Sequence, residues 1–144
     1  MTTQQLSIFM ENKPGQLVQV TDALAGAGID IRAMALADTK DFGIVRMLVS
    51  DCAKAQAVMR EKGFMSTITK VMCIALDDHP GGLSGVTKCL AQAGVNIDYL
   101  YACITDIGKN AYIVMHVDNE ETACKVLDEA GIRMVSAEEL AELG

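Results

Sequence analysis

Hydrophobic residues fall at two spacings along the chain, and these spacings recur in the same order in its two halves. Apolar runs over residues 6–10 and 72–76 are typical of strands. Each run is followed by apolar residues at the three- and four-residue spacing of an amphipathic helix. These helical positions are Leu17, Val20, Thr21 and Leu24 in the first half, and Leu83, Val86, Thr87 and Leu90 in the second.

The ends of these two predicted helices carry residues that suit helix termini. Pro14 and Pro80 suit the first helical turn, where the missing N–H group costs nothing. Gly28 and Gly94 suit the left-handed position that follows a helix. We therefore expect a strand and then a helix at the start of each half.

The rest of each half predicts a hairpin, a second helix and a last strand. Polar turn residues separate the alternating segment 29–37 from the apolar run 44–49. Asp51 and Asn119 are suited to cap the second helix of each half, which a glycine then ends. The last strands are expected at 64–68 and 132–135, and Ser136-Ala137-Glu138-Glu139 is a capping box that predicts a short C-terminal helix.

An internal repeat relates the two halves. Pro14-Gly15-Gln16-Leu17 returns as Pro80-Gly81-Gly82-Leu83, and ten of the eighteen positions from Pro14 to Ile31 are identical at this shift of 66. Beyond the first hairpin strand the shift becomes 68, which implies two inserted residues around 106–110. The chain is therefore interpreted as two copies of one small unit, at residues 1–70 and 71–144.

The order of elements in each copy predicts the fold class. Each copy has a strand, a helix, two strands, a helix and a strand. Two right-handed βαβ crossovers then place both helices on one face of a four-stranded antiparallel sheet. We predict an α+β protein made of two ferredoxin-like βαββαβ units.

The sheet face that the helices leave open is also predicted to be apolar. Central strands carry apolar residues at both alternate positions, as at Ile44, Val45, Met47 and Leu48. A sheet face in water normally carries polar residues. We therefore expect a second sheet, from the other copy or from another chain, to cover this face, and we expect at least a homodimer.

The composition indicates a globular protein that does not bind nucleic acid. Of the 144 residues, 51% are hydrophobic and 22% are charged, and 19 acidic residues against 12 Lys and Arg give a net charge of −7. This charge repels a phosphate backbone, and the basic residues are scattered. Because no apolar run approaches a membrane span of about 20 residues and the first residues do not resemble a signal peptide, we expect a cytoplasmic protein with no membrane partner.

No motif in the sequence indicates catalysis or a metal. The five cysteines lie at spacings of 21, 16, 14 and 21, which match no CxxC or zinc pattern, and we interpret them as packing or surface thiols. Neither His79 nor His116 has a carboxylate or nucleophile at a fixed spacing. We expect no catalytic residue, no cofactor and no metal, with a metal at His79, Asp77 and Asp78 as the minor alternative.

The loops that lead into the first helix of each copy resemble those of ACT domains. The first loop, Asn12-Lys13-Pro14-Gly15-Gln16-Leu17, is followed by Gly28-Ile29-Asp30-Ile31 at the second strand. The second loop, Asp78-His79-Pro80-Gly81-Gly82-Leu83, is followed by Gly94-Val95-Asn96-Ile97. The resemblance covers roughly residues 4–136. It implies a regulatory module that binds a small ligand, most often an amino acid, at the interface between two units.

The resemblance also implies a protein without catalytic activity of its own. ACT domains usually accompany a catalytic domain, for which this chain has no room, so we expect a free-standing sensor that acts on a separate metabolic enzyme or pathway. One alternative is a regulatory subunit that resembles the small subunit of acetolactate synthase. A small ferredoxin-like enzyme is a second alternative, which the missing catalytic motif disfavours.

The first loop has the chemistry of a carboxylate site. Gly15 allows a ligand to approach the backbone closely, and the N–H groups that open the next helix favour an anion. The amide of Asn12 can both donate and accept a hydrogen bond. The alternative is that Asn12 or Asp78 merely caps its helix.

Amide and carboxylate exchange places between the copies. The loops begin with Asn12 and Asp78, whereas the second strands begin with Asp30 and Asn96. If these strands pair antiparallel, Asn12 meets Asn96 in a neutral site for an amino acid, and Asp78 meets Asp30 in a site that favours a cation, an ammonium group or no ligand. Pairing of like copies from two chains would give mixed sites instead. The expected ligand-binding residues are Asn12, Lys13, Pro14, Gly15, Gln16, Leu17, Asp30, Asp78, His79, Gly81, Gly82, Leu83 and Asn96.

Overall fold

The chain folds as two compact units. One spans Gln4–Thr69, and the other spans Lys70–Gly144 and includes Met1–Thr3. The computed structural model describes residues 2–38, 42–77, 79–103 and 110–143. The two-residue insertion predicted around 106–110 therefore lies largely outside the described residues.

The first unit has the predicted order of strand, helix, two strands, helix and strand. Its elements are β1 (Thr3–Glu11), α1 (Gln16–Gly26), β2 (Ile31–Asp38), β3 (Phe42–Val49), α2 (Cys52–Glu61) and the beginning of β4 (Met65–Asp77). Strand β3 pairs antiparallel with both β1 and β2. Its register with β1 aligns Leu6 with Met47. The order β2-β3-β1-β4 is that of a ferredoxin-like unit.

The second unit repeats this arrangement. After β4 it contains α3 (Gly82–Gln92), β5 (Ile97–Ala102), β6 (Asn110–Val117), α4 (Glu120–Glu129), β7 (Arg133–Met134) and α5 (Ala137–Leu143). Strand β6 pairs antiparallel with β4 and β5, and the short β7 pairs with β4. The order β7-β4-β6-β5 matches the first unit. Among the described helices, none is long and apolar enough to cross a membrane.

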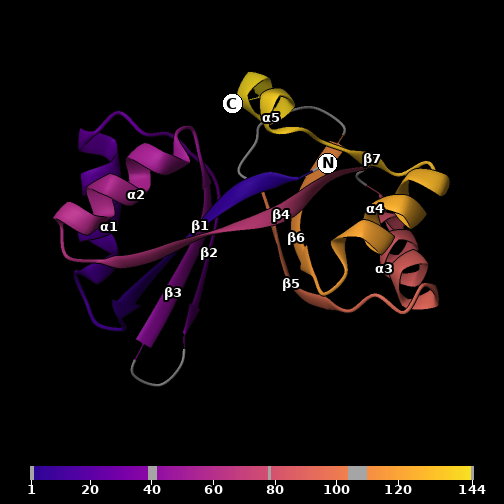
Figure 1. The fold of residues 1–144 in the computed structure, drawn as a ribbon, viewed down its shortest axis with the longest axis horizontal. Coiled ribbons are helices and arrows are strands. Elements are labelled where there is room, and N and C mark those ends of the chain that lie inside the picture. The colour runs from indigo at the N-terminus through magenta and orange to yellow at the C-terminus, as the bar shows by residue number, and fades with distance from the viewer. Residues whose placement is uncertain (1, 39–41, 78, 104–109, 144) are drawn as a thin grey trace. The chain divides into compact units, whose positions relative to one another are not determined.

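Both helices of a unit pack on the same face of its sheet, and the core lies between this face and the helices. Figure 1 shows α1 and α2 together beside the strands of the first unit, and α3 and α4 together in the second. Alternate residues of the central strands face these helices, as the two-residue period of a strand requires. The first core contains Leu6, Ile8, Met10, Val20, Leu24, Val45, Met47, Ala55 and Met59, and the second contains Met72, Ile74, Leu76, Val86, Leu90, Met115, Ala123 and Leu127.

The opposite sheet face is apolar in the second unit, as predicted, but mixed in the first, where the buried Gln5 and Ser7 lie on the same face of β1 as Phe9. In the second unit, Tyr112 and Val114 alternate with core residues of β6 and are 5% and 0% exposed. In the first unit, Leu48 is buried, whereas Phe9 and Phe42 are 40% and 63% exposed. A second chain that covers the exposed aromatic residues stays a prediction.

Side chains cap the second helix of each unit, which confirms the predicted starts. The carboxylate of Asp51 accepts a hydrogen bond from Lys54 N at 3.0 Å, and the amide oxygen of Asn119 accepts one from Thr122 N at 3.1 Å. The hydroxyl of Ser136 accepts a hydrogen bond from the backbone N–H three residues later, at the start of α5.

The two prolines lie before their helices and not in the first helical turn, so this prediction is wrong. Helices α1 and α3 begin two residues after Pro14 and Pro80. The intervening residues, Gly15 and Gly81, have φ angles of 90° and 94°, which belong to the left-handed region. A right-handed helix cannot extend through such a residue, so each proline belongs to the preceding turn.

Candidate ligand-binding site

The first loop leads into α1 without a side-chain cap. Gly15 is the N-cap residue, in a left-handed conformation that residues with a Cβ atom rarely adopt. No described side chain accepts a hydrogen bond at this helix end. Asn12 instead donates from Nδ2 to Asp38 Oδ2 at 3.4 Å. The structure therefore contradicts the alternative in which Asn12 caps the helix.

The first loop lines a cavity of about 390 Å³, which we call the first-loop cavity. All six residues of the first loop, Asn12, Lys13, Pro14, Gly15, Gln16 and Leu17, contribute to its walls. The remaining walls include Met10 of β1, Leu36 of β2 and Gly43 of β3. Ligand pockets of proteins commonly measure about 300–1,000 Å³, so this cavity suits a small molecule.

Opposite charges meet at the rim of the first-loop cavity. Lys13 Nζ lies 3.0 Å from Glu11 Oε2, and both side chains are more than half exposed. An exposed ion pair of this kind contributes little to stability, because water solvates both partners. It does place a cation and an anion within reach of the same small ligand.

The second loop has the same backbone form but less space at its helix start. Gly81 is the N-cap residue of α3, again without a side-chain cap among the described residues. A Cβ atom on Gly82 would lie 2.7 Å from the carbonyl oxygen of Asp77, a contact that no side chain tolerates. The equivalent first-loop residue is Gln16, which has a side chain. Asp78 lies outside the described residues.

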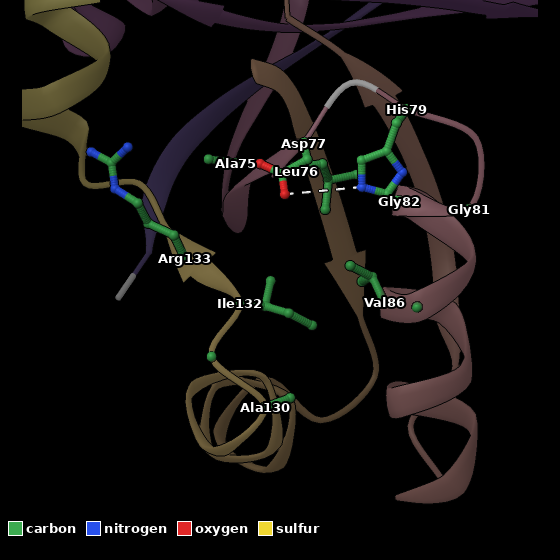
Figure 2. A pocket seen from close by; sticks show the side chains of 12 residues that line it. Ala75, Leu76, Asp77, His79, Gly81, Gly82, Val86, Ala130, Ile132 and Arg133 are labelled. Carbon is green, nitrogen blue, oxygen red and sulfur yellow. Dashed lines mark ion pairs between the residues drawn. The ribbon is translucent and has the colours of Figure 1, made fainter. Parts of the chain in front are cut away.

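A cavity of about 490 Å³, the second-loop cavity, lies beside the second loop (Figure 2). His79, Gly81 and Gly82 line it, whereas the predicted site residue Leu83 is not among its lining residues. His79 Nδ1 lies 2.9 Å from the carbonyl oxygen of Pro80 and carries the shared proton, because a carbonyl can only accept. Its Nε2 lies 3.9 Å from Asp77 Oδ2, the pair that Figure 2 marks.

The two loop cavities open toward different elements of their units. Leu36 of β2 and Gly43 of β3 line the first-loop cavity, whereas residues 130–132, between α4 and β7, and Arg133 of β7 line the second-loop cavity. Figure 2 shows Ile132 across the cavity from Val86, whereas the Arg133 side chain extends away from the second loop. The copies therefore offer two different sites, although their loops share one motif.

The predicted residues at the strand starts bond within their own units. The backbone N–H of Asp30 donates to Ser50 Oγ at 2.9 Å, and that of Asn96 donates to Asp118 Oδ1 at 2.9 Å. Neither Asp30 nor Asn96 lines the loop cavity of its own unit. The pairing of Asn12 with Asn96, and of Asp78 with Asp30, stays a prediction.

The sequence interpretation missed a polar cluster on the second sheet. No carboxylate stands at a fixed sequence spacing from His116, but in the folded sheet its Nδ1 lies 2.8 Å from Asp98 Oδ2. Tyr99 stacks on the same imidazole ring, with centroids 5.1 Å apart, and Asn96 Nδ2 donates to Asp98 Oδ1 at 3.1 Å. A register shift between Ile97 and Tyr99 places Asp98 beside His116. The sequence carries no signal for this irregular register, so it could not predict the contact.

One family model matches the whole chain. It describes an ACT domain pair, and the match covers residues 1–144. The chain belongs to the ACT domain pair family. This match confirms the predicted resemblance to ACT domains and the predicted α+β fold with ferredoxin-like βαββαβ units.

Solved structures share the fold of this ACT domain pair. A protein from Bacteroides thetaiotaomicron is 36% identical, with a TM-score of 0.92, and the match covers 99% of this chain and 98% of that one. The ligand-free regulatory subunit of aspartate kinase from Thermus thermophilus is 15% identical, with a TM-score of 0.65 and coverage of 88% and 91%. Aspartokinase alpha and beta subunits are 18% identical, with a TM-score of 0.60 and coverage of 90% and 92%. The last two show a shared fold alone, and no protein with a curated function matches the sequence.

Proposed function

We propose that this ACT domain pair is a non-catalytic regulatory protein that binds a free amino acid at the first loop. The observation that carries the proposal is the uncapped start of α1, which follows the left-handed Gly15 and lines a cavity of about 390 Å³. Backbone N–H groups at a helix start form a site for an anion. A structural turn alone would not need this cavity.

The charges at the first-loop cavity complement both ends of an α-amino acid. The carboxylate of the ligand binds the N–H groups of the first turn of α1 and the Asn12 amide, with Lys13 nearby. The helix dipole adds about 0.3–1 kcal/mol to this contact. The ammonium group of the ligand binds Glu11, which lines the same cavity. A molecule that lacks either end loses one of these contacts.

The second loop forms a site of different specificity in this proposal. Asp77, His79 and Arg133 line the second-loop cavity, so its charged groups differ from those of the first. We propose that Asn96 completes the first-loop site and that Asp30 and Asp78 belong to the second-loop site. We also propose that the two units correspond to residues 1–70 and 71–144. Two carboxylates at one site disfavour a ligand carboxylate.

Ligand binding acts on a separate enzyme or pathway in this proposal, through a dimer of the chain. The exposed Phe9 and Phe42 of the first sheet supply an apolar surface for such assembly. The fold neighbour from Thermus thermophilus is a regulatory subunit, which supports this mode of action. An allosteric coupling of about 1–3 kcal/mol is typical of such regulation.

Thermal unfolding in the presence of each of the twenty amino acids tests the proposal. A ligand that binds only the native state stabilises it by about 2.7 kcal/mol at a concentration of 100 times its Kd. We expect at least one amino acid to raise the melting temperature by several degrees. The amine that lacks the carboxylate of that amino acid is the control and should give no shift. No shift with any amino acid would contradict the proposal.

A further inference from the structure

Two cysteine side chains of the second unit lie next to each other. The Sγ atoms of Cys73 and Cys103 are 3.8 Å apart. Cys73 lies in β4, opposite Val114 of β6, and Cys103 directly follows β5, where its N–H donates to the carbonyl of Tyr112 at 2.9 Å. The two thiols are 30 residues apart in the sequence, so only the folded sheet brings them together.

The two sulfurs differ in their access to solvent. Cys73 is 1% exposed, and its carbonyl accepts a hydrogen bond from Val135 N at 2.7 Å, so the segment that leads into α5 lies against it. Cys103 is only partly buried. A small oxidant from solvent therefore reaches Cys103 first.

The protonation of the pair also differs. The hydrogen bond to Cys103 raises the pKa of the Cys73 thiol, and burial and the nearby Glu139 carboxylate raise it further. The same hydrogen bond lowers the pKa of Cys103, against the opposing effect of burial. The lowered pKa favours the thiolate at Cys103, and the thiolate is the more reactive form of cysteine.

We propose that Cys73 and Cys103 are a redox-sensitive pair that forms a disulfide when a hydroperoxide oxidises Cys103. The Cys103 sulfur attacks the peroxide and the O–O bond breaks. Cys103 becomes a sulfenic acid, and its thiol proton passes to the other oxygen, which leaves as water or an alcohol. The Cys73 sulfur then attacks the Cys103 sulfur. The S–S bond forms, the S–O bond breaks, and the proton of Cys73 leaves with the hydroxyl group as water. The thiols lose two electrons, and the peroxide gains them.

The second step requires the two sulfurs to approach from 3.8 Å to the disulfide length of about 2.0 Å. Strand β6 lies between β4 and β5, so bond formation also requires the segment after β5 to move toward β4. Cys103 follows the last residue of β5, and its movement would have to lengthen the hydrogen bond from its N–H to Tyr112 O. Two other cysteines contact groups that are not thiols: Cys89 Sγ donates to Val126 O, and Cys124 Sγ donates to Met72 Sδ.

Peptide mapping of the oxidised full-length chain tests the proposal. Trypsin cleaves after Lys70, Lys88 and Lys109, so Cys73 and Cys103 fall in the peptides 71–88 and 89–109. The second peptide also holds Cys89, so the Cys89→Ser variant is used as the parent. After treatment of the folded protein with hydrogen peroxide, we expect these peptides to be linked, and dithiothreitol should separate them.

Matched variants assign the two roles. Cys103→Ser should abolish the linked peptide, whereas Cys52→Ala, in the first unit, should leave its yield unchanged. In Cys73→Ser, the sulfenic acid at Cys103 should persist and be trapped by dimedone. Far-UV circular dichroism confirms that each variant is folded. Absence of the linked peptide in the folded parent, or its formation only in urea, would overturn the proposal.

Discussion

Replacement of Leu24 by Ala is expected to lower the free energy of unfolding by about 2–5 kcal/mol. Leu24 lies in α1, is 0% exposed and packs in the core between α1 and β1. Removal of its isobutyl group leaves a cavity that neighbouring residues fill only in part. Leu90 has the same position in α3 and is also 0% exposed, so Leu90→Ala should cost a similar amount. Urea denaturation of the purified variants measures both changes.

A second position on α1 provides the control for this prediction. Val18 is 59% exposed on the same helix, so Val18→Ala should change the free energy of unfolding by about 0.5 kcal/mol or less. A loss in Leu24→Ala no larger than in Val18→Ala would show that this helix face does not form the core.

Gly82→Ala is expected to destabilise the second unit by about 1–3 kcal/mol, because the new methyl group cannot fit beside the backbone. Its Cβ atom would lie 2.7 Å from the carbonyl oxygen of Asp77, and a backbone carbonyl cannot move aside as a flexible side chain can. The second loop would have to shift away from the start of α3. Chemical denaturation of the full chain gives the change in stability.

Gly85→Ala is the matched control, and the opposite sign is expected. Gly85 lies in the same helix, and a Cβ atom added there meets nothing within 4 Å. Alanine in a helix is about 0.5–1 kcal/mol more stable than glycine. If both substitutions stabilise the chain, the close approach of Gly82 to Asp77 does not occur in solution.

The architecture could be predicted because the same pattern of strands and helices occurs in both halves of the sequence. The repeated Pro-Gly loops, the helical spacing of positions such as Leu24 and Leu90, and the caps at Asp51 and Asn119 all indicate the same elements, and the structure confirms them. Agreement between local propensity, pattern and fold is typical of natural proteins. Because the motif occurs in both copies, a chance match in either copy is less probable.

The details of the site could not be predicted, because they depend on backbone conformation. A proline before a glycine suits either a first helical turn or the turn before it, and only the left-handed φ of Gly15 decides between them. The replacement of Gln16 by Gly82 looks neutral in the sequence, yet the structure shows that no larger residue fits.

Side-chain contacts across the sheet could not be predicted from the sequence either, because they depend on the register and order of the strands. The pairing of Asp98 with His116 requires an irregular register in the β5–β6 hairpin, and one residue of shift reverses the face of every side chain. Cys73 and Cys103 meet only once three strands are ordered side by side. Their spacing in the sequence matches no cysteine motif.

Calorimetric titration of the wild-type chain and the Asn12→Ala variant tests the central claim most directly, with the amino acid that gives the largest thermal shift as the titrant. Asn12 does not cap α1, so its replacement should leave stability unchanged. Gln92→Ala, an exposed amide at the end of α3, is the control and should bind as the wild type does. The account predicts that Asn12→Ala weakens the affinity at least tenfold, about 1.4 kcal/mol, because the ligand carboxylate loses a hydrogen bond. An affinity equal to that of the wild type would contradict the assignment of the amino-acid site to the first loop.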